Sequence, residues 1–246
     1  MNHRAVQRAL FRMQLDPGFA ARLRAGEIDA HLGAAELALL RAADPGALSA
    51  DRDLRRLGQF LRNVSEEFAR ACAAGVPAEG FTSSPEFHDA VARDASLPLA
   101  FGRYAERCSA DGSRAQRALV ALERALARAR RELRASGGPG PGELALAPWA
   151  WLVALPAGTL DLAAGVRESL DPAGDESVLV LAAREAAPFR LREVQAEALS
   201  LDLARLLEAA QKPRALAELA RVCGEAESDV AAIASELVAE GVLVAG

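Results

Sequence analysis

The sequence predicts a mainly α-helical protein with a small α+β part, in which an N-terminal helical domain precedes a C-terminal winged-helix-like domain with a short antiparallel sheet. Residues 1–135 place their apolar side chains at helical spacing. Residues 136–142 (SGGPGPG) form a Gly/Pro linker, because neither a helix nor a strand continues through such a run. In residues 143–246, short apolar runs typical of strands come first and helices follow.

The start and stop signals of the first domain predict several helices. Asp16 followed by Pro17 is typical of a helix N-terminus, and the apolar stripe that follows ends at Gly26. Ser84 is the expected N-cap of a helix that reaches about Arg93. Further helices are predicted over residues 51–74, from residue 97 onward, and over residues 112–135, where Leu119, Leu122, Leu126 and Leu133 form the expected buried stripe.

The second domain is predicted to change from strands to helices along the chain. Three strands are expected over residues 149–155, 178–181 and 189–194, and the short link between the last two predicts a hairpin. Ser200, Pro213 and Ser228 are the expected starts of three helices that end at 210, 224 and 241, and residues 242–244 form a final strand. This order resembles a winged helix-turn-helix.

Composition favours a cytoplasmic protein. Hydrophobic residues make up 51% of the 246 residues, which is enough to bury a sizeable core, yet no apolar run approaches the ~18 residues that span a bilayer. The N-terminus shows no signal-peptide pattern. Cys72, Cys108 and Cys223 are far apart and odd in number, which fits a reducing cytosol and argues against disulfides or structural zinc.

Charge is distributed unevenly along the chain, whose net charge is −5. Residues 1–142 have 21 Arg against 17 Asp and Glu, a net +4, whereas residues 143–246 have 8 Lys and Arg against 17 Asp and Glu, a net −9. The last helix, over residues 229–240, has acidic residues and no basic ones. A DNA-binding protein needs basic side chains to contact the phosphates, so we expect no nucleic acid as partner. A DNA-binding transcriptional regulator is the alternative hypothesis.

No pattern in the sequence predicts a catalytic or metal site. His3, His31 and His88 lack a second ligand at metal-binding spacing. The glycines at 137–140 lack the Gly-Lys-Ser/Thr ending of a phosphate loop, and no strand precedes them. Cys223 lies at a helix end without a nearby His, which favours packing over reactivity. We therefore expect no enzyme activity, and an enzyme with an unrecognised site is a further alternative.

The arginine-rich segment over residues 114–134 has two interpretations. It could contact an acidic partner, including the protein's own C-terminal half, or its arginines could form a solvated helix face, which is the commoner case.

A peptide-binding groove is the use that fits an acidic winged helix. A peptide can extend a sheet edge as an additional strand while its side chains enter apolar pockets. The strand 189–194 and the helix 229–240 are the expected walls, and a purely structural role is the alternative. The candidate peptide-binding residues are Phe189, Leu191, Arg192, Glu193, Val194, Val230, Ile233, Ala234 and Leu237.

Two parts of the sequence resemble known families. The C-terminal segments 178–181, 189–194, 203–207, 215–219 and 230–243 resemble the winged-helix peptide-recognition element of pathways that modify ribosomally made peptides. The N-terminal segments 81–88, 97–101 with Tyr104, 122–123 and 130–131 resemble partner subunits of multinuclear non-heme iron peptide oxidases, of the methanobactin type.

The resemblance implies a noncatalytic partner that binds the leader of a precursor peptide and forms a heterodimer with an iron-dependent oxidase. The iron, its ligands and the oxidation of a peptide cysteine would then belong to the oxidase, and this chain would hold no cofactor. The residues expected to dock on the oxidase are Phe87, His88, Phe101, Tyr104, Arg130 and Arg131.

Overall fold

The protein folds into two compact units, Met1–Asp111 and Gly112–Gly246, in a computed structural model. The structure describes residues 3–28, 32–44, 53–93, 95–135, 137–170, 174–185 and 191–246, with the side chains of Arg4 and of residues 53–57 left aside. Helices dominate, and two three-stranded antiparallel sheets lie in the second unit, which confirms the predicted fold class.

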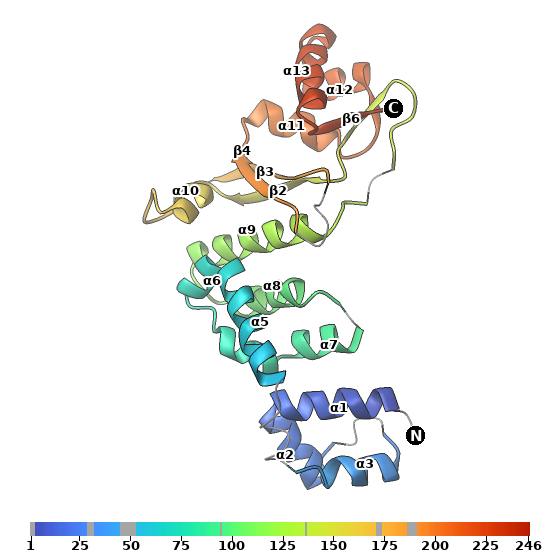
Figure 1. The fold of residues 1–246 in the computed structure, drawn as a ribbon. Coiled ribbons are helices and arrows are strands. Elements are labelled where there is room, and N and C mark those ends of the chain that lie inside the picture. Colours follow the sequence, from blue (N-terminus) through green and yellow to red (C-terminus); the bar gives the residue numbers. More distant parts are fainter. Residues whose placement is uncertain are drawn as a thin grey trace. The chain divides into compact units, whose positions relative to one another are not determined.

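The first unit consists of short helices (Figure 1). Asp16 caps α2 by accepting a hydrogen bond from the Phe19 amide at 2.9 Å, and Gly26 ends it with a φ of 81°, as predicted. The predicted helix 51–74 is interrupted at Phe68. The elements are α1 (His3–Leu15), α2 (Pro17–Ala25), α3 (Ala34–Arg41), α5 (Asp53–Glu67), α6 (Ala69–Ala73), the 3₁₀ helix η1 (Ala78–Ser83), α7 (Pro85–Arg93) and α8 (Leu97–Cys108).

The first unit has two core clusters, a mainly aliphatic one between α1, α2 and α3 and an aromatic one around Phe81. Phe81 is fully buried, and its ring centroid lies 5.3 Å from that of Phe87, 5.1 Å from Phe101 and 5.5 Å from Tyr104. Phe68 packs edge-on against Phe101 at 5.0 Å. Large rings fill the irregular spaces between short helices, and their edge-to-face geometry adds stability beyond the buried area.

The second unit begins with a long helix and ends with the winged-helix-like part. Its elements are α9 (Arg114–Arg131), β1 (Glu143–Leu146), β2 (Ala150–Pro156), α10 (Thr159–Ala164), β3 (Asp175–Ala182), β4 (Val194–Ala198), α11 (Leu201–Ala209), β5 (Arg214–Ala215), α12 (Leu216–Cys223), α13 (Glu227–Ala239) and β6 (Leu243–Ala245).

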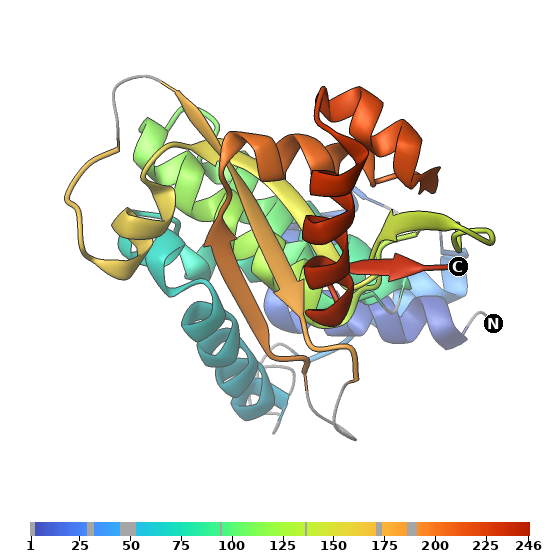
Figure 2. The same ribbon diagram turned by 90° about the horizontal axis from the view of Figure 1, so that it is seen from above.

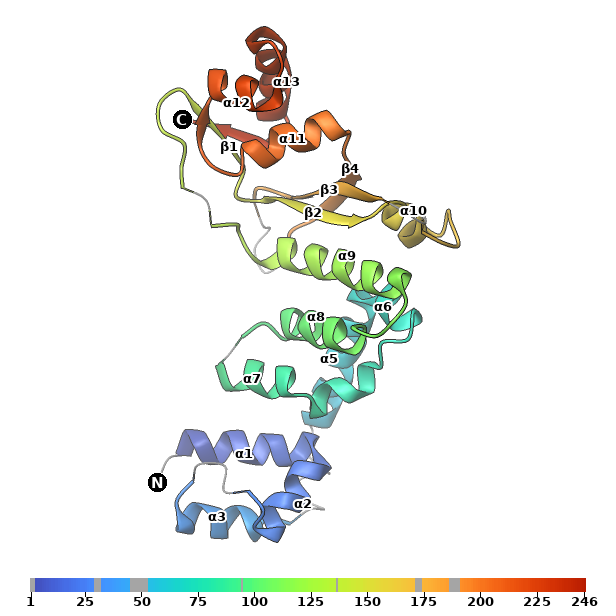
Figure 3. The ribbon, with the colours of Figure 1, turned by 180° about the vertical axis from the view of Figure 1, so that it is seen from behind.

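The sheet β2-β3-β4 has helices on both faces. Alternate side chains point to opposite faces of a strand, so the two faces have different neighbours. Val178 and Val180 of β3 pack with Leu122 of α9, whereas Leu179 packs with Leu207 of α11. Figures 1 and 3 show α9 on one side of this sheet and α11 on the other.

The second sheet, in the order β5-β1-β6, completes the winged-helix-like part with α11, α12 and α13. Leu144 of β1 lies opposite Arg214 of β5 on one side and Ala245 of β6 on the other. Figure 2 shows the red terminal strand β6 beside β1. The sequence analysis did not find β1, β5 or the short helix α10, because each is too short to show a period.

Several predicted boundaries differ from the structure. The third strand is Val194–Ala198 and not 189–194, although it pairs with β3 as the hairpin prediction expected. Pro213 precedes β5 rather than starting a helix, and α13 begins at Glu227 with Ala226 as its N-cap in place of Ser228. Leu133, predicted to be buried, lies past the end of α9 and is exposed.

The arginine-rich helix belongs to the second unit. The compact units divide the chain between residues 111 and 112, whereas the sequence analysis placed the division at 136–142. Arg114 donates to the Gly174 carbonyl at 2.8 Å, and the Arg128 guanidinium lies 4.4 Å from the ring centroid of Trp151. Arg134, just beyond the helix, donates to the Leu146 carbonyl at 2.6 Å. The helix therefore contacts the protein's own C-terminal half, the less common of its two predicted interpretations.

Candidate functional site

Among the residues that the structure describes, 191–194 and the helix at 229–240 do not form the predicted groove. Val194 begins β4 and packs on the α9 side of the sheet. Val230, Ala234 and Leu237 of α13 are buried in the core on the opposite side. Leu191, Arg192 and Glu193 precede β4 as irregular chain, and Phe189 lies outside the described residues. The alternation of side chains across the sheet separates the two expected walls.

A different groove lies on the winged-helix-like part, between α11, α13 and the end of α12. Its volume is about 500 Å³, and two of the predicted peptide-binding residues, Val230 and Ile233, line it. Ile233 is 44% exposed, so its side chain is accessible from solvent. From α11, Leu203 and Leu206 add apolar surface to the same groove. This groove therefore includes two of the four predicted residues of α13, and α11 forms its other wall.

Acidic side chains surround this apolar surface. Asp202, Glu225 and Asp229 line the groove against a single basic residue, Arg205, which lies 3.8 Å from Asp202. Burial raises the pKa of the Cys223 thiol, and nearby Glu225 adds to that shift, so this cysteine lacks the lowered pKa of a reactive thiol. The groove therefore suits apolar side chains flanked by positive charge.

A further groove of about 450 Å³ follows β2, an outer strand of its sheet. The Trp149 carbonyl accepts a hydrogen bond from the backbone amide of Ala182, next to the β2–β3 ladder. In an antiparallel ladder, every second residue of a strand directs its backbone N–H and C=O away from the partner strand. By this alternation, Leu152 and Ala154 direct theirs away from β3. Lys212 also lines this groove. The β2 edge is thus available for strand addition on a side of the sheet that the sequence did not indicate.

Three of the six predicted docking residues are core residues. Phe87 and Phe101 are fully buried, and Tyr104 is nearly so, with its hydroxyl donating to the Pro77 carbonyl at 2.6 Å. Burial raises the pKa of the Tyr104 phenol. These positions cannot form a docking surface without disrupting the unit, which corrects the prediction. Arg130 and Arg131 are half-buried in the second unit, where the Arg130 carbonyl accepts from the Arg192 amide at 3.4 Å.

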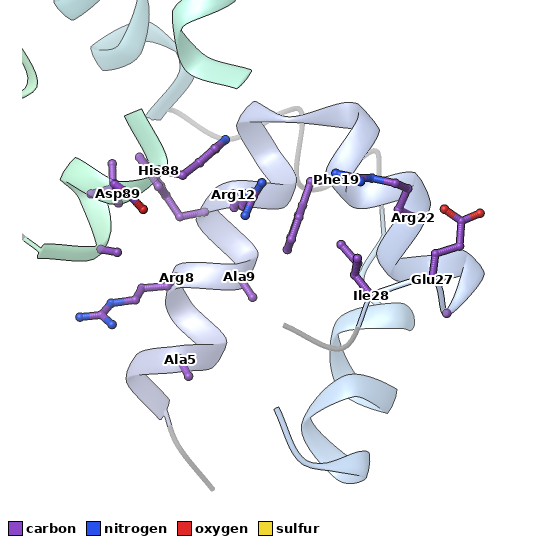
Figure 4. Close-up of a pocket in the computed structure, with 14 residues that line it drawn as sticks. Ala5, Arg8, Ala9, Arg12, Phe19, Arg22, Glu27, Ile28, His88 and Asp89 are labelled. Atoms are coloured by element: carbon purple, nitrogen blue, oxygen red, sulfur yellow. The ribbon is translucent and has the colours of Figure 1, made fainter. Parts of the chain in front are cut away.

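His88 is the predicted docking residue that lines a cavity. The cavity is an open cleft of about 880 Å³ between α1, α2 and α7 (Figure 4). The His88 side chain is 10% exposed, and its Nε2 lies 3.5 Å from Asp16 Oδ2. The Nε of Arg12 lies 3.7 Å from the same oxygen. The carboxylate of Asp16, which precedes α2, therefore lies close to both Arg12 of α1 and His88 of α7.

Electrostatics at this junction keep the histidine neutral. Burial lowers the pKa of His88 to about 4, and the positive charge of Arg12 acts in the same direction, against the opposing effect of Asp16. On the same helix, hydrogen bonds from Arg107 at 2.7 and 2.9 Å lower the pKa of Glu86 to about 2. At neutral pH, His88 thus adds no positive charge to the cleft.

Three arginines supply the positive charge of the cleft. Arg8 and Arg12 lie one turn apart on α1, and Arg22 lies on α2. Figure 4 shows Arg8 and Arg22 on opposite sides of Arg12, whose guanidinium lies 4.1 Å from the ring centroid of Phe19. The sequence analysis missed this cleft, because α1 and α7 are more than seventy residues apart in the chain. The available signal was the i, i+4 pair Arg8 and Arg12 beside small alanines.

Neither a metal-binding cluster among the described residues nor a similar known protein points to a further site. Within the described ranges, no three His, Cys, Asp or Glu side chains are grouped so as to hold a metal ion. No helix in the part of the chain that the structure describes is long and apolar enough to cross a membrane. The sequence matches no protein-family model and no curated protein.

Proposed function

We propose that this protein is a noncatalytic partner in the biosynthesis of a ribosomally made, modified peptide. In this proposal the second unit binds the leader of the precursor peptide, and the first unit docks on an iron-dependent oxidase that modifies a peptide cysteine. The iron would be held by the oxidase, and this chain would contribute binding and positioning only.

The groove between α11 and α13 carries the proposal. It combines accessible apolar residues, Leu203 and Ile233, with three carboxylates at Asp202, Glu225 and Asp229. Such a surface fits a peptide that presents apolar anchors next to Lys or Arg. The resemblance of the C-terminal segments to peptide-recognition elements supports the same use.

A DNA-binding regulator is the less favoured function for the same fold. The second unit has 15 Lys and Arg against 19 Asp and Glu, a net charge of −4. This is less negative than the −9 of residues 143–246, because residues 112–142 add six arginines on α9 and Arg134 against two glutamates. Helix α13, at the position of a recognition helix, has no basic residue, since the added arginines lie on α9 and at Arg134. Its carboxylates would repel the DNA backbone.

Calorimetry with the full chain and a precursor leader peptide encoded near its gene tests the proposal. We expect binding that weakens at least tenfold in Ile233→Arg, because the substitution places a cation in the apolar centre of the groove. Leu191→Arg is the matched control, since Leu191 is also exposed, at 52%, and does not line the groove. Ala154→Asp, at the β2 edge, is the control for strand addition.

The outcomes separate the alternatives. Equal affinity of Ile233→Arg and the unchanged protein for the leader would exclude the α11–α13 groove as its binding site. Loss of leader binding in Ala154→Asp alone would indicate that the peptide binds at the β2 edge. Absence of heat with every leader tested would reject peptide binding. Duplex DNA binding with a steep dependence on salt would favour the regulator.

A further inference from the structure

The cleft on α1 has the form of a helix-binding groove. Ala5, Arg8, Ala9 and Arg12 occupy one face of α1 at spacings of three and four residues, and all four line the cleft. Small side chains on such a face let the backbone of a second helix approach closely. The face runs from residue 5 to residue 12, about 10 Å along the axis, which corresponds to about two turns of a bound helix.

Charge complementarity specifies what would occupy this groove. Among the residues that the structure describes, neither Arg8 nor Arg22 has an ion-pair partner, and both are exposed. The cleft also contains Glu27 and Asp89, but Asp89 already lies 3.8 Å from Arg93. Figure 4 shows Glu27 beyond Arg22, on the side away from His88. The middle of the cleft is therefore both apolar and positively charged.

A buried polar cluster forms one wall of the cleft. The His88 side chain is nine-tenths buried, and its Nε2 lies 3.5 Å from the Asp16 carboxylate. The Nε of Arg12 is also buried and lies 3.7 Å from the same carboxylate. Because both nitrogens are shielded from solvent, an occupant of the cleft would meet the exposed guanidinium groups of Arg8 and Arg22 instead.

We propose that this cleft binds an acidic amphipathic helix of a protein partner, with its apolar residues on the partly exposed Ala5, Phe11 and Ile28 and its carboxylates on Arg8, Arg12 and Arg22. The inference deepens the docking role proposed above and rests on it only for the identity of the partner. The chemistry of the cleft can be tested without the oxidase.

Selection from a phage-displayed library of helices, with the exposed positions randomised, tests the proposal on the full chain. We expect the selected helices to be rich in Asp and Glu beside an apolar stripe. Their affinity should fall at least tenfold for the double variant Arg8→Glu/Arg22→Glu and should persist for Arg8→Lys/Arg22→Lys. Arg103→Glu on α8 is the matched control, because Arg103 is exposed and does not line the cleft.

A charge swap sharpens the result. The Arg8→Glu/Arg22→Glu protein should itself select basic amphipathic helices. Helices without an acidic bias, or affinities that are equal in the double variant and the control, would overturn the proposal. Competition by a 20-nucleotide polyadenylate that requires the same arginines would overturn it in favour of RNA. Loss of oxidase binding without any change in helix selection would count against the proposed function alone.

Discussion

The α1 cleft of the first unit and the α11–α13 groove of the second differ in charge, and the units that contain them differ in their aromatic content. Arginines line the first site, and carboxylates surround the second. The first unit combines an aliphatic cluster between α1, α2 and α3 with phenylalanine rings between short helices, whereas the second packs mainly Val, Leu and Ala on both faces of a sheet. In the functions proposed above, these two sites of opposite charge would hold two different partners.

The largest effect should separate the two cores. Phe81→Ala removes a fully buried ring that lies next to four other rings, so we expect a loss of about 3–5 kcal/mol in the first unit. Amide hydrogen exchange, resolved by peptide, should show the loss in peptides from residues 1–111. Leu219→Ala, at a fully buried position of α12, should weaken the second unit instead. Equal losses in both units would contradict separate cores.

The next effect concerns pH and the first unit. His88 has a pKa of about 4 in the folded state, below its unfolded value of about 6.5, so the unfolded chain takes up this proton first on acidification. The free energy of unfolding should therefore fall between pH 6.5 and pH 4, by up to about 3 kcal/mol. His88→Gln should lose this dependence in denaturant titrations. If the free energy of unfolding depends on pH in the same way in both proteins, His88 is not the cause of the dependence.

A smaller effect should test the docking of α9 in the second unit. Arg134 donates to the carbonyls of Leu146 and Gln211, and burial lowers its pKa. Because Arg134→Ala leaves these carbonyls without their charged donor, we expect a loss of about 2 kcal/mol. Trp149 and Trp151 are the only tryptophans and both belong to this unit, so their fluorescence follows it. Arg221→Ala, at an exposed position of α12, is the control and should change the free energy of unfolding little. If Arg221→Ala and Arg134→Ala lower it equally, the hydrogen bonds of Arg134 do not explain the loss.

The smallest effects compare helix caps in the two units. Ser84 is buried and accepts from the Phe87 amide at 3.2 Å, whereas Ser200 is exposed and accepts from the Leu203 amide at 3.3 Å. Ser84→Ala should cost about 1–2 kcal/mol and Ser200→Ala about 0.5–1 kcal/mol. Thermal unfolding of the two variants checks the order, and a larger loss in Ser200→Ala would reverse the comparison.

Local signals in the sequence predicted several helix starts, but they misplaced the starts of α12 and α13 and did not predict which residues meet in the candidate sites. The caps at Asp16, Ser84 and Ser200 lie where the sequence placed them, because a cap depends on residues three positions apart. The strand predicted at 189–194 lies instead at 194–198, since an alternating pattern of a few residues does not fix its own register. Phe87 and Phe101 carried the family resemblance, yet they build the core.

The sequence by itself determined the fold class, the helix starts at Asp16, Ser84 and Ser200, and the absence of basic residues from α13, because these properties depend on composition and on neighbours within one turn. Tertiary structure decided where α9 packs and which residues meet in the two candidate sites. The α1 cleft joins Arg12 to His88, and the α11–α13 groove joins Leu203 to Ile233. Such contacts depend on how helices pack against one another, and that information is not contained in any single segment of the chain.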